Sequence, residues 1–121
     1  MTETYVGMAT DFDDDVRKGV VVEGREVFVF RRGPRFYAFE NRCAHAGGPV
    51  GEGTIIGKVK AVLGPGKELL REEFSDTELQ IVCPWHGYEY DIETGTCAAD
   101  GRFGLRRYTV VERGQDVYVV A

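Results

Sequence analysis

Histidine, cysteine and proline are scarce in this sequence of 121 residues, which contains 2, 3 and 4 of them respectively. No uninterrupted apolar run is long enough to cross a bilayer, and residues 1–7 lack the basic and apolar regions of a secretion signal. We therefore expect a cytoplasmic location and no membrane partner. The net charge of -5 arises from interspersed acidic and basic residues, which argues against a nucleic-acid partner. An odd number of cysteines in a reducing compartment favours metal binding over disulfides.

Apolar residues make up 43% of the chain and recur in short alternating runs separated by glycine-containing turns. This pattern is typical of a small all-β sandwich or barrel, and the length suits a single domain. The predicted strands are residues 5–9, 19–23, 26–31, 35–40, 79–82, 88–91, 108–112 and 117–120. Residues 55–78 interrupt the pattern. A short helix over residues 67–74 is predicted as one alternative there, because good helix formers surround the Leu70 and Phe74 pair.

Cysteine and histidine occur together in two separate segments, Cys43-Ala44-His45-Ala46-Gly47-Gly48-Pro49 and Cys83-Pro84-Trp85-His86-Gly87. Each segment offers one thiolate and one imidazole. Two thiolates suit one iron of a sulfide-bridged pair and two imidazoles suit the other. A zinc-stapled binding module with the same four ligands is the alternative, although zinc sites usually place like ligands in one short segment. Cys97 has no nearby histidine and is predicted to be a small packed thiol.

The two segments resemble the Rieske signature, Cys-x-His-x-Gly followed by Cys-Pro-x-His-Gly, and residues 90–95 extend the resemblance. The resemblance implies one Rieske domain over residues 1–121, an all-β antiparallel sandwich or barrel with a small cluster-binding subdomain. It places the ligand loops at about residues 41–53 and 82–95, with an insertion between them at about 55–78. It further implies one [2Fe-2S] cluster, with Cys43 and Cys83 on the inner iron and His45 and His86 on the outer iron.

High-potential Rieske proteins brace these loops with a disulfide and donate a serine hydroxyl to a bridging sulfide. In this sequence Gly48 and Trp85 stand where those cysteines would be, and Tyr88 stands where the serine would be. With no disulfide and fewer hydrogen bonds to sulfur, we predict a reduction potential on the order of -150 mV. Trp85 is expected to pack over the cluster as an apolar shield, with a role in docking as the alternative.

Rieske oxygenases also carry a mononuclear iron on two histidines and one carboxylate. This chain has only 2 histidines, and both are assigned to the cluster, so it is predicted to be an electron-transfer protein rather than an enzyme. It resembles the ferredoxin components of bacterial aromatic-ring dioxygenase systems, which implies a flavin-dependent reductase and a terminal oxygenase as partners. A small subunit of another redox complex, such as a nitrite-reductase-type system, is the alternative. The insertion is either a surface excursion or a docking element, and the oligomeric state is open.

Overall fold

The computed structural model describes residues 2–13, 16–44, 47–85 and 87–121. Within these ranges the chain consists of β-strands and short 3-10 turns, with no α-helix, so the all-β prediction is confirmed. No helix in the described part is long and apolar enough to span a bilayer. The elements in chain order are β1 (Glu3–Met8), η1 (Ala9–Asp11), β2 (Lys18–Val22), β3 (Arg25–Arg32), β4 (Arg35–Glu40), η2 (Val50–Glu52), β5 (Thr54–Leu63), η3 (Pro65–Lys67), β6 (Leu69–Val82), β7 (Glu89–Asp91), β8 (Arg107–Arg113) and β9 (Asp116–Val120).

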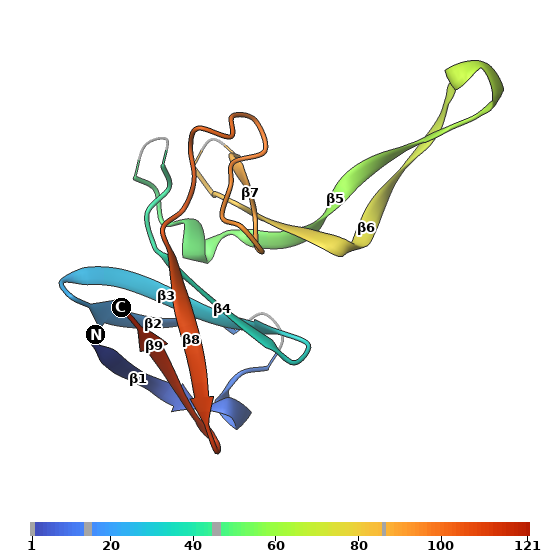
Figure 1. The fold of residues 1–121 in the computed structure, drawn as a ribbon. Helices are drawn as coiled ribbons and strands as arrows, with labels where there is room; N and C mark the ends of the chain where they lie inside the picture. The colour runs from blue at the N-terminus through green and yellow to red at the C-terminus, as the bar shows by residue number, and fades with distance from the viewer. Residues whose placement is uncertain (1, 14–15, 45–46, 86) are drawn as a thin grey trace.

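The strands form two antiparallel sheets. The larger sheet has the order β1-β9-β8-β4-β3-β2, and the smaller sheet has the order β5-β6-β7. Figure 1 shows the larger sheet as the base of the molecule and the smaller sheet above it. The strands predicted at residues 19–23, 26–31 and 35–40 form a meander of β2, β3 and β4, and those predicted at 108–112 and 117–120 form the final hairpin of β8 and β9. Local alternation of apolar residues was therefore sufficient to identify the base.

Strand β3 is buried on both faces, which explains its four consecutive buried residues. Val27 and Val29 point into one core, which they share with residues of β2, β8 and β9. Phe28 and Phe30 point to the opposite face and belong to a second core, which includes residues of β4, β6 and β7. Alternate side chains of a strand face opposite ways, so β3 and β4 separate two hydrophobic cores.

The second core joins the smaller sheet to the base. Its members are Phe28, Phe30, Tyr37, Phe39, Cys43, Val50, Ile81, Cys83, Tyr90, Ile92, Cys97 and Leu105. Gly51 allows the close approach at this junction, because a Cβ atom on it would lie 2.7 Å from Cγ of Phe28. Two of the predicted metal ligands, Cys43 and Cys83, are thus part of the packed core rather than of a loose surface loop.

Residues 55–78 do not contain the short helix that was predicted as one alternative over residues 67–74. This stretch forms most of a long antiparallel hairpin of β5 and β6, and residues 69–74 are strand rather than helix. The turn at its end is made by η3, where Gly66 and Lys67 both have positive φ. Two turns of helix are only marginally stable alone, whereas the cross-strand ladder satisfies the backbone of both arms. The insertion therefore continues the smaller sheet beyond the body of the protein.

Candidate metal centre

Two loops at one end of the molecule carry the predicted ligands. The first runs from the end of β4 to η2 and contains Cys43, and the second joins β6 to β7 and contains Cys83. Both loops leave strands that pack into the second core, so the position of each cysteine is set by a buried strand. The cysteines themselves are almost completely inaccessible, with exposed fractions of 3% for Cys43 and 1% for Cys83.

The two loops adopt the same backbone turn. In each, the cysteine N–H donates to the carbonyl oxygen five residues later, and the cysteine carbonyl accepts the N–H of the residue four positions later. These bonds run from Cys43 to Gly48 (2.8 Å), Gly47 to Cys43 (2.8 Å), Cys83 to Tyr88 (2.8 Å) and Gly87 to Cys83 (3.1 Å). Gly47 and Gly87 have φ values of 74° and 72°, which glycine adopts without steric cost. The equivalent turns place the two cysteines as a matched pair.

Besides burial, the Cys43 side chain raises the pKa of the Cys83 thiol, so the two sulfurs lie close enough to interact across the two loops. Burial raises the pKa of the Cys83 thiol, the backbone N–H of Trp85 lowers it, and Cys43 raises it further. Two adjacent buried thiols resist ionisation together, but a cation bound between them would stabilise both thiolates. Neither Cys43 nor Cys83 is used in a disulfide, so both sulfurs can serve as metal ligands.

Tyr90 of β7 supplies a hydroxyl to this pair. Its oxygen lies 3.0 Å from Sγ of Cys43 and accepts the backbone N–H of Ala44 at 3.2 Å. Either group could donate while Cys43 is a thiol, but a thiolate has no proton, so only the tyrosine hydroxyl can donate to a Cys43 thiolate. Tyr90 is fully buried, and burial is the main reason that its pKa lies far above the ordinary value, with a further contribution from Cys43. The hydroxyl therefore stays protonated and is available as a donor to Cys43 once that residue is a thiolate.

This pairing of two cysteine loops agrees with the comparison with known families. Residues 2–103 match the model of the Rieske [2Fe-2S] domain. The chain belongs to this family. A Rieske domain-containing protein of Homo sapiens is 33% identical over 95 residues, which make up 75% of this chain and 50% of that protein. The chain thus spans about half the length of its human relative.

Two solved structures match nearly the whole chain. The ferredoxin of carbazole 1,9a-dioxygenase from Nocardioides aromaticivorans IC177 is 27% identical, with a TM-score of 0.70 over 98% of this chain and 97% of that one. A putative NADH-dependent nitrite reductase small subunit from Mycobacterium tuberculosis has a TM-score of 0.75 at 17% identity, over 99% of this chain and 96% of that one. The second similarity concerns the fold alone.

The donor set of this Rieske protein fits a [2Fe-2S] cluster, the cofactor that the family binds. Two buried, neighbouring thiols match the two thiolates that one iron requires. The Tyr90 hydroxyl and the backbone N–H of Trp85 can donate hydrogen bonds to the two thiolates. His45 and His86, the two predicted imidazole ligands, lie outside the described residues. The structure therefore brings together the sulfur half of the predicted ligand set, and the nitrogen half stays a prediction.

Trp85 and Gly48 occupy the positions where high-potential Rieske proteins have a disulfide, and here they pack against each other. A Cβ atom on Gly48 would lie 2.8 Å from both Cγ and Cδ2 of the indole. The ring thus lies directly on the backbone of the first loop and braces it against the second. Trp85 keeps an exposed fraction of 50%, so it covers one loop and still presents an aromatic surface to solvent. Its role as a shield of the cluster stays a prediction.

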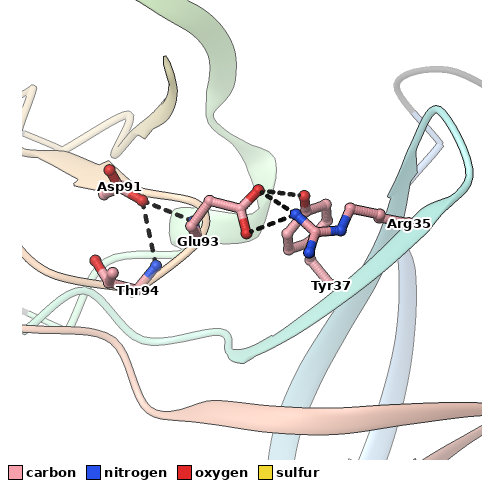
Figure 2. Close-up of polar contacts among 5 residues, drawn as sticks. All are labelled: Arg35, Tyr37, Asp91, Glu93 and Thr94. Atoms are coloured by element: carbon pink, nitrogen blue, oxygen red, sulfur yellow. Dashed lines mark hydrogen bonds and ion pairs between the residues drawn. The ribbon is translucent and has the colours of Figure 1, made fainter. Parts of the chain in front are cut away.

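The turn after β7 is anchored to the base by a polar network. The Tyr37 hydroxyl donates to Oε1 of Glu93 at 2.6 Å, and Nη1 of Arg35 donates to both Glu93 carboxylate oxygens at 3.2 Å. Oδ1 of Asp91 accepts the backbone N–H groups of Glu93 (2.7 Å) and Thr94 (3.2 Å). Figure 2 shows Glu93 between the Asp91 turn and the Arg35 and Tyr37 side chains of β4. Because Asp91 directly follows Tyr90, this network also fixes the tyrosine that contacts Cys43.

Sequence reasoning identified the two cysteines but missed Tyr90 and Glu93. It considered Tyr88 as the residue in the place of the serine and assigned no role to Glu93. One signal was present in the sequence: Tyr88 and Tyr90 alternate with Glu89, so Tyr90 belongs to the same face as Tyr88 one step deeper in the strand. Cys97 is buried, and its backbone forms an antiparallel β-bridge with that of Tyr90. The burial agrees with the prediction of a packed thiol.

Proposed function

We propose that this Rieske protein is a soluble, cytoplasmic one-electron carrier, formed by residues 1–121 as one domain. The observation that carries the proposal is the matched pair of buried cysteines on two loops with the same turn. The Rieske family and the ferredoxin neighbour support an electron carrier. His45 and His86 would complete the ligand set with Cys43 and Cys83. The bound cluster would supply reversible one-electron chemistry.

The described residues would prepare this site in two ways. Burial of Cys43 and Cys83 removes water from the sulfur side, and the Tyr90 hydroxyl and Trp85 N–H offset the negative charge on the two sulfurs. The equivalent turns and the Trp85 contact with Gly48 hold the loops in one arrangement, so little rearrangement would accompany a change of charge. The half-exposed indole of Trp85, which is part of the second loop, would offer an aromatic contact to a partner.

For partners we propose a flavin-dependent reductase as electron donor and a terminal oxygenase as acceptor. Support comes from the carbazole dioxygenase ferredoxin, which matches nearly the full length of both chains at 27% identity. A nitrite-reductase-type complex is the second candidate, since the small subunit from Mycobacterium tuberculosis has the same fold. The lower identity of that protein, 17%, makes it the weaker guide to function.

The cluster is tested by anaerobic purification, iron and sulfide analysis, and EPR of the dithionite-reduced protein. We expect two irons and two sulfides per chain and the spectrum of a mixed cysteine- and histidine-ligated cluster. His45→Ala and His86→Ala should lose that spectrum, whereas Cys97→Ser, which removes the remaining cysteine, should retain it. A colourless protein that contains zinc would contradict the carrier proposal and select the binding module.

The partner class is tested by electron transfer under anaerobic conditions. The reduced protein is mixed with the oxygenase of a carbazole dioxygenase system or, separately, with the large subunit of an NADH-dependent nitrite reductase, and cluster absorbance is followed. Faster oxidation by the oxygenase supports our first choice, and faster oxidation by the nitrite reductase subunit selects the second. A carrier oxidised by neither, yet carrying the expected cluster, would refute both partner assignments without affecting the cluster assignment.

A further inference from the structure

The distal part of the β5–β6 hairpin, residues 59–74, is a two-stranded ribbon that leaves the body of the protein. Figure 1 shows the ends of β5 and β6 projecting away from β7 and from the larger sheet. β7 pairs with β6 only at residues 80–82, near the base of the hairpin. None of the distal residues is assigned to either hydrophobic core or packed against it. Isolated two-stranded hairpins are at best marginally stable in water, so this ribbon needs further contacts.

One face of the ribbon is apolar. The cross-strand pairs Val59 with Phe74, Ala61 with Glu72, and Leu63 with Leu69 have their side chains on this face. Four of the six are large apolar residues in solvent, with exposed fractions of 47% for Val59, 54% for Leu63, 59% for Leu69 and 69% for Phe74. We call these four residues the ribbon patch. The opposite face carries the pair of Val62 and Arg71, and Arg71 forms an ion pair with Glu73.

The ribbon is built for contact through this face rather than through its edges. The ladder is irregular at two places, between Gly57 and Val59 and between Val62 and Leu63. Such irregularities twist a ribbon and interrupt the even spacing of hydrogen-bonding groups along its edges. They are a common protection against edge-to-edge strand pairing. The apolar face has no comparable protection.

The size of the patch and the need for lasting cover favour a second copy of the same chain. Together with the neighbouring Leu70, the patch exposes about 500 Å² of largely apolar surface, at the upper end of what monomers tolerate. Two such surfaces in contact would bury about 1,000 Å², the lower limit for a specific interface. An electron carrier releases its redox partners after each transfer, so they would leave the patch exposed most of the time. A second copy is present wherever the chain is.

We propose that the ribbon patches of two chains pack face to face and form a two-fold symmetric dimer. A two-fold axis along the ribbon would set Glu72 of one copy over Ala61 of the other, because these residues are paired across the strands. The two carboxylates would then not oppose each other. Val59 would face the larger Phe74, and Leu63 would face Leu69, so apolar side chains would meet apolar side chains.

The test is the mass of the cluster-loaded protein by light scattering and sedimentation velocity, over a range of about 1 to 100 µM. The wild type should have about twice the chain mass of 13.5 kDa. The double variant Leu63→Asp, Phe74→Asp should dissociate with a dimer constant about a hundredfold weaker, because both changes place charge in the patch. Val62→Asp is the matched control on the opposite face of the same strand and should remain dimeric.

A second variant guards against local unfolding of the ribbon. Replacement of residues 60–73 by Asn-Gly closes the Val59 and Phe74 pair with a two-residue turn and removes Leu63 and Leu69, two of the four residues of the patch. This protein should keep the cluster spectrum and be monomeric. A wild type that stays monomeric at about 100 µM overturns the proposal. So does a double variant or a shortened chain that still dimerises, or a Val62→Asp protein that dissociates like the double variant.

Discussion

Removal of the Tyr90 hydroxyl tests how the buried site sets the reduction potential. Tyr90→Phe deletes one atom, the oxygen that lies 3.0 Å from Sγ of Cys43, and leaves the ring in the core. A hydrogen bond to a charged acceptor contributes about 1.5–3 kcal/mol, and it strengthens when an added electron makes the sulfur more negative. If about 1 kcal/mol of this is gained only on reduction, the potential of the variant falls by about 40 mV, because 59 mV corresponds to about 1.4 kcal/mol for one electron.

The assay is a spectroelectrochemical titration of the wild type and the variant at pH 7. Tyr37→Phe is the matched control, since it removes a hydroxyl from a second buried tyrosine that donates to Glu93 rather than to sulfur. Its reduction potential should stay within about 10 mV of the wild-type value. This is small beside the shift of about 59 mV that corresponds to a tenfold change in the equilibrium constant of a one-electron reaction. A Tyr90→Phe potential that is unchanged or higher than that of the wild type would refute the assigned direction of this hydrogen bond.

Three further predictions concern the loops and their supports. Gly48→Ala should lower the free energy of unfolding by about 1–3 kcal/mol, measured by thermal unfolding, because the new methyl group meets the Trp85 ring. Gly19→Ala is the control and should show no such loss, because its methyl group meets nothing within 4 Å. Burial, followed by the hydrogen bond to Glu93, raises the pKa of Tyr37 above its ordinary value of 10.0, so this tyrosine stabilises the fold below pH 10 and its contribution is lost as pH rises further. Urea unfolding of Tyr37→Phe should therefore show a weaker decline above about pH 10 than the wild type, and an equal decline would contradict this. If imidazoles bind the outer iron, the reduction potential should decrease with pH in the alkaline range, and a flat profile in voltammetry would count against them.

The base of the fold was predictable from sequence because its signals are local. Strand β3 alternates valine with phenylalanine, and a glycine turn follows each of β2 and β3. The hairpin of β5 and β6 was not predictable in the same way. Its distal arms carry charged and apolar residues in runs that also suit a helix, so the local pattern did not select the strand pairing that the structure has. Its exposed apolar face removes the usual contrast between a buried and a solvated side.

The candidate site was predictable to the extent that its ligands lie in short motifs. Cys43 and Cys83 could be identified because each stands beside a histidine and a glycine that the loop requires. The hydrogen bond from Tyr90 could not be derived, because residues 43 and 90 are close only through the packing of the second core. The same holds for Glu93, which reaches Tyr37 across the junction of the two sheets. Short motifs thus reveal ligands, whereas the groups that tune them depend on tertiary structure.

The two-core arrangement explains how a site at one end of a small protein is held firmly. Phe28 and Phe30 pack beneath the cysteine loops, and Val27 and Val29 pack on the other side of the same strand. A displacement of the loops relative to the base would therefore disturb both cores, since interiors are close-packed. The polar network from Tyr37 to Glu93 adds a second attachment beside Tyr90. A donor network attached in this way changes little when the charge beside it changes, which lowers the reorganisation that one-electron transfer requires.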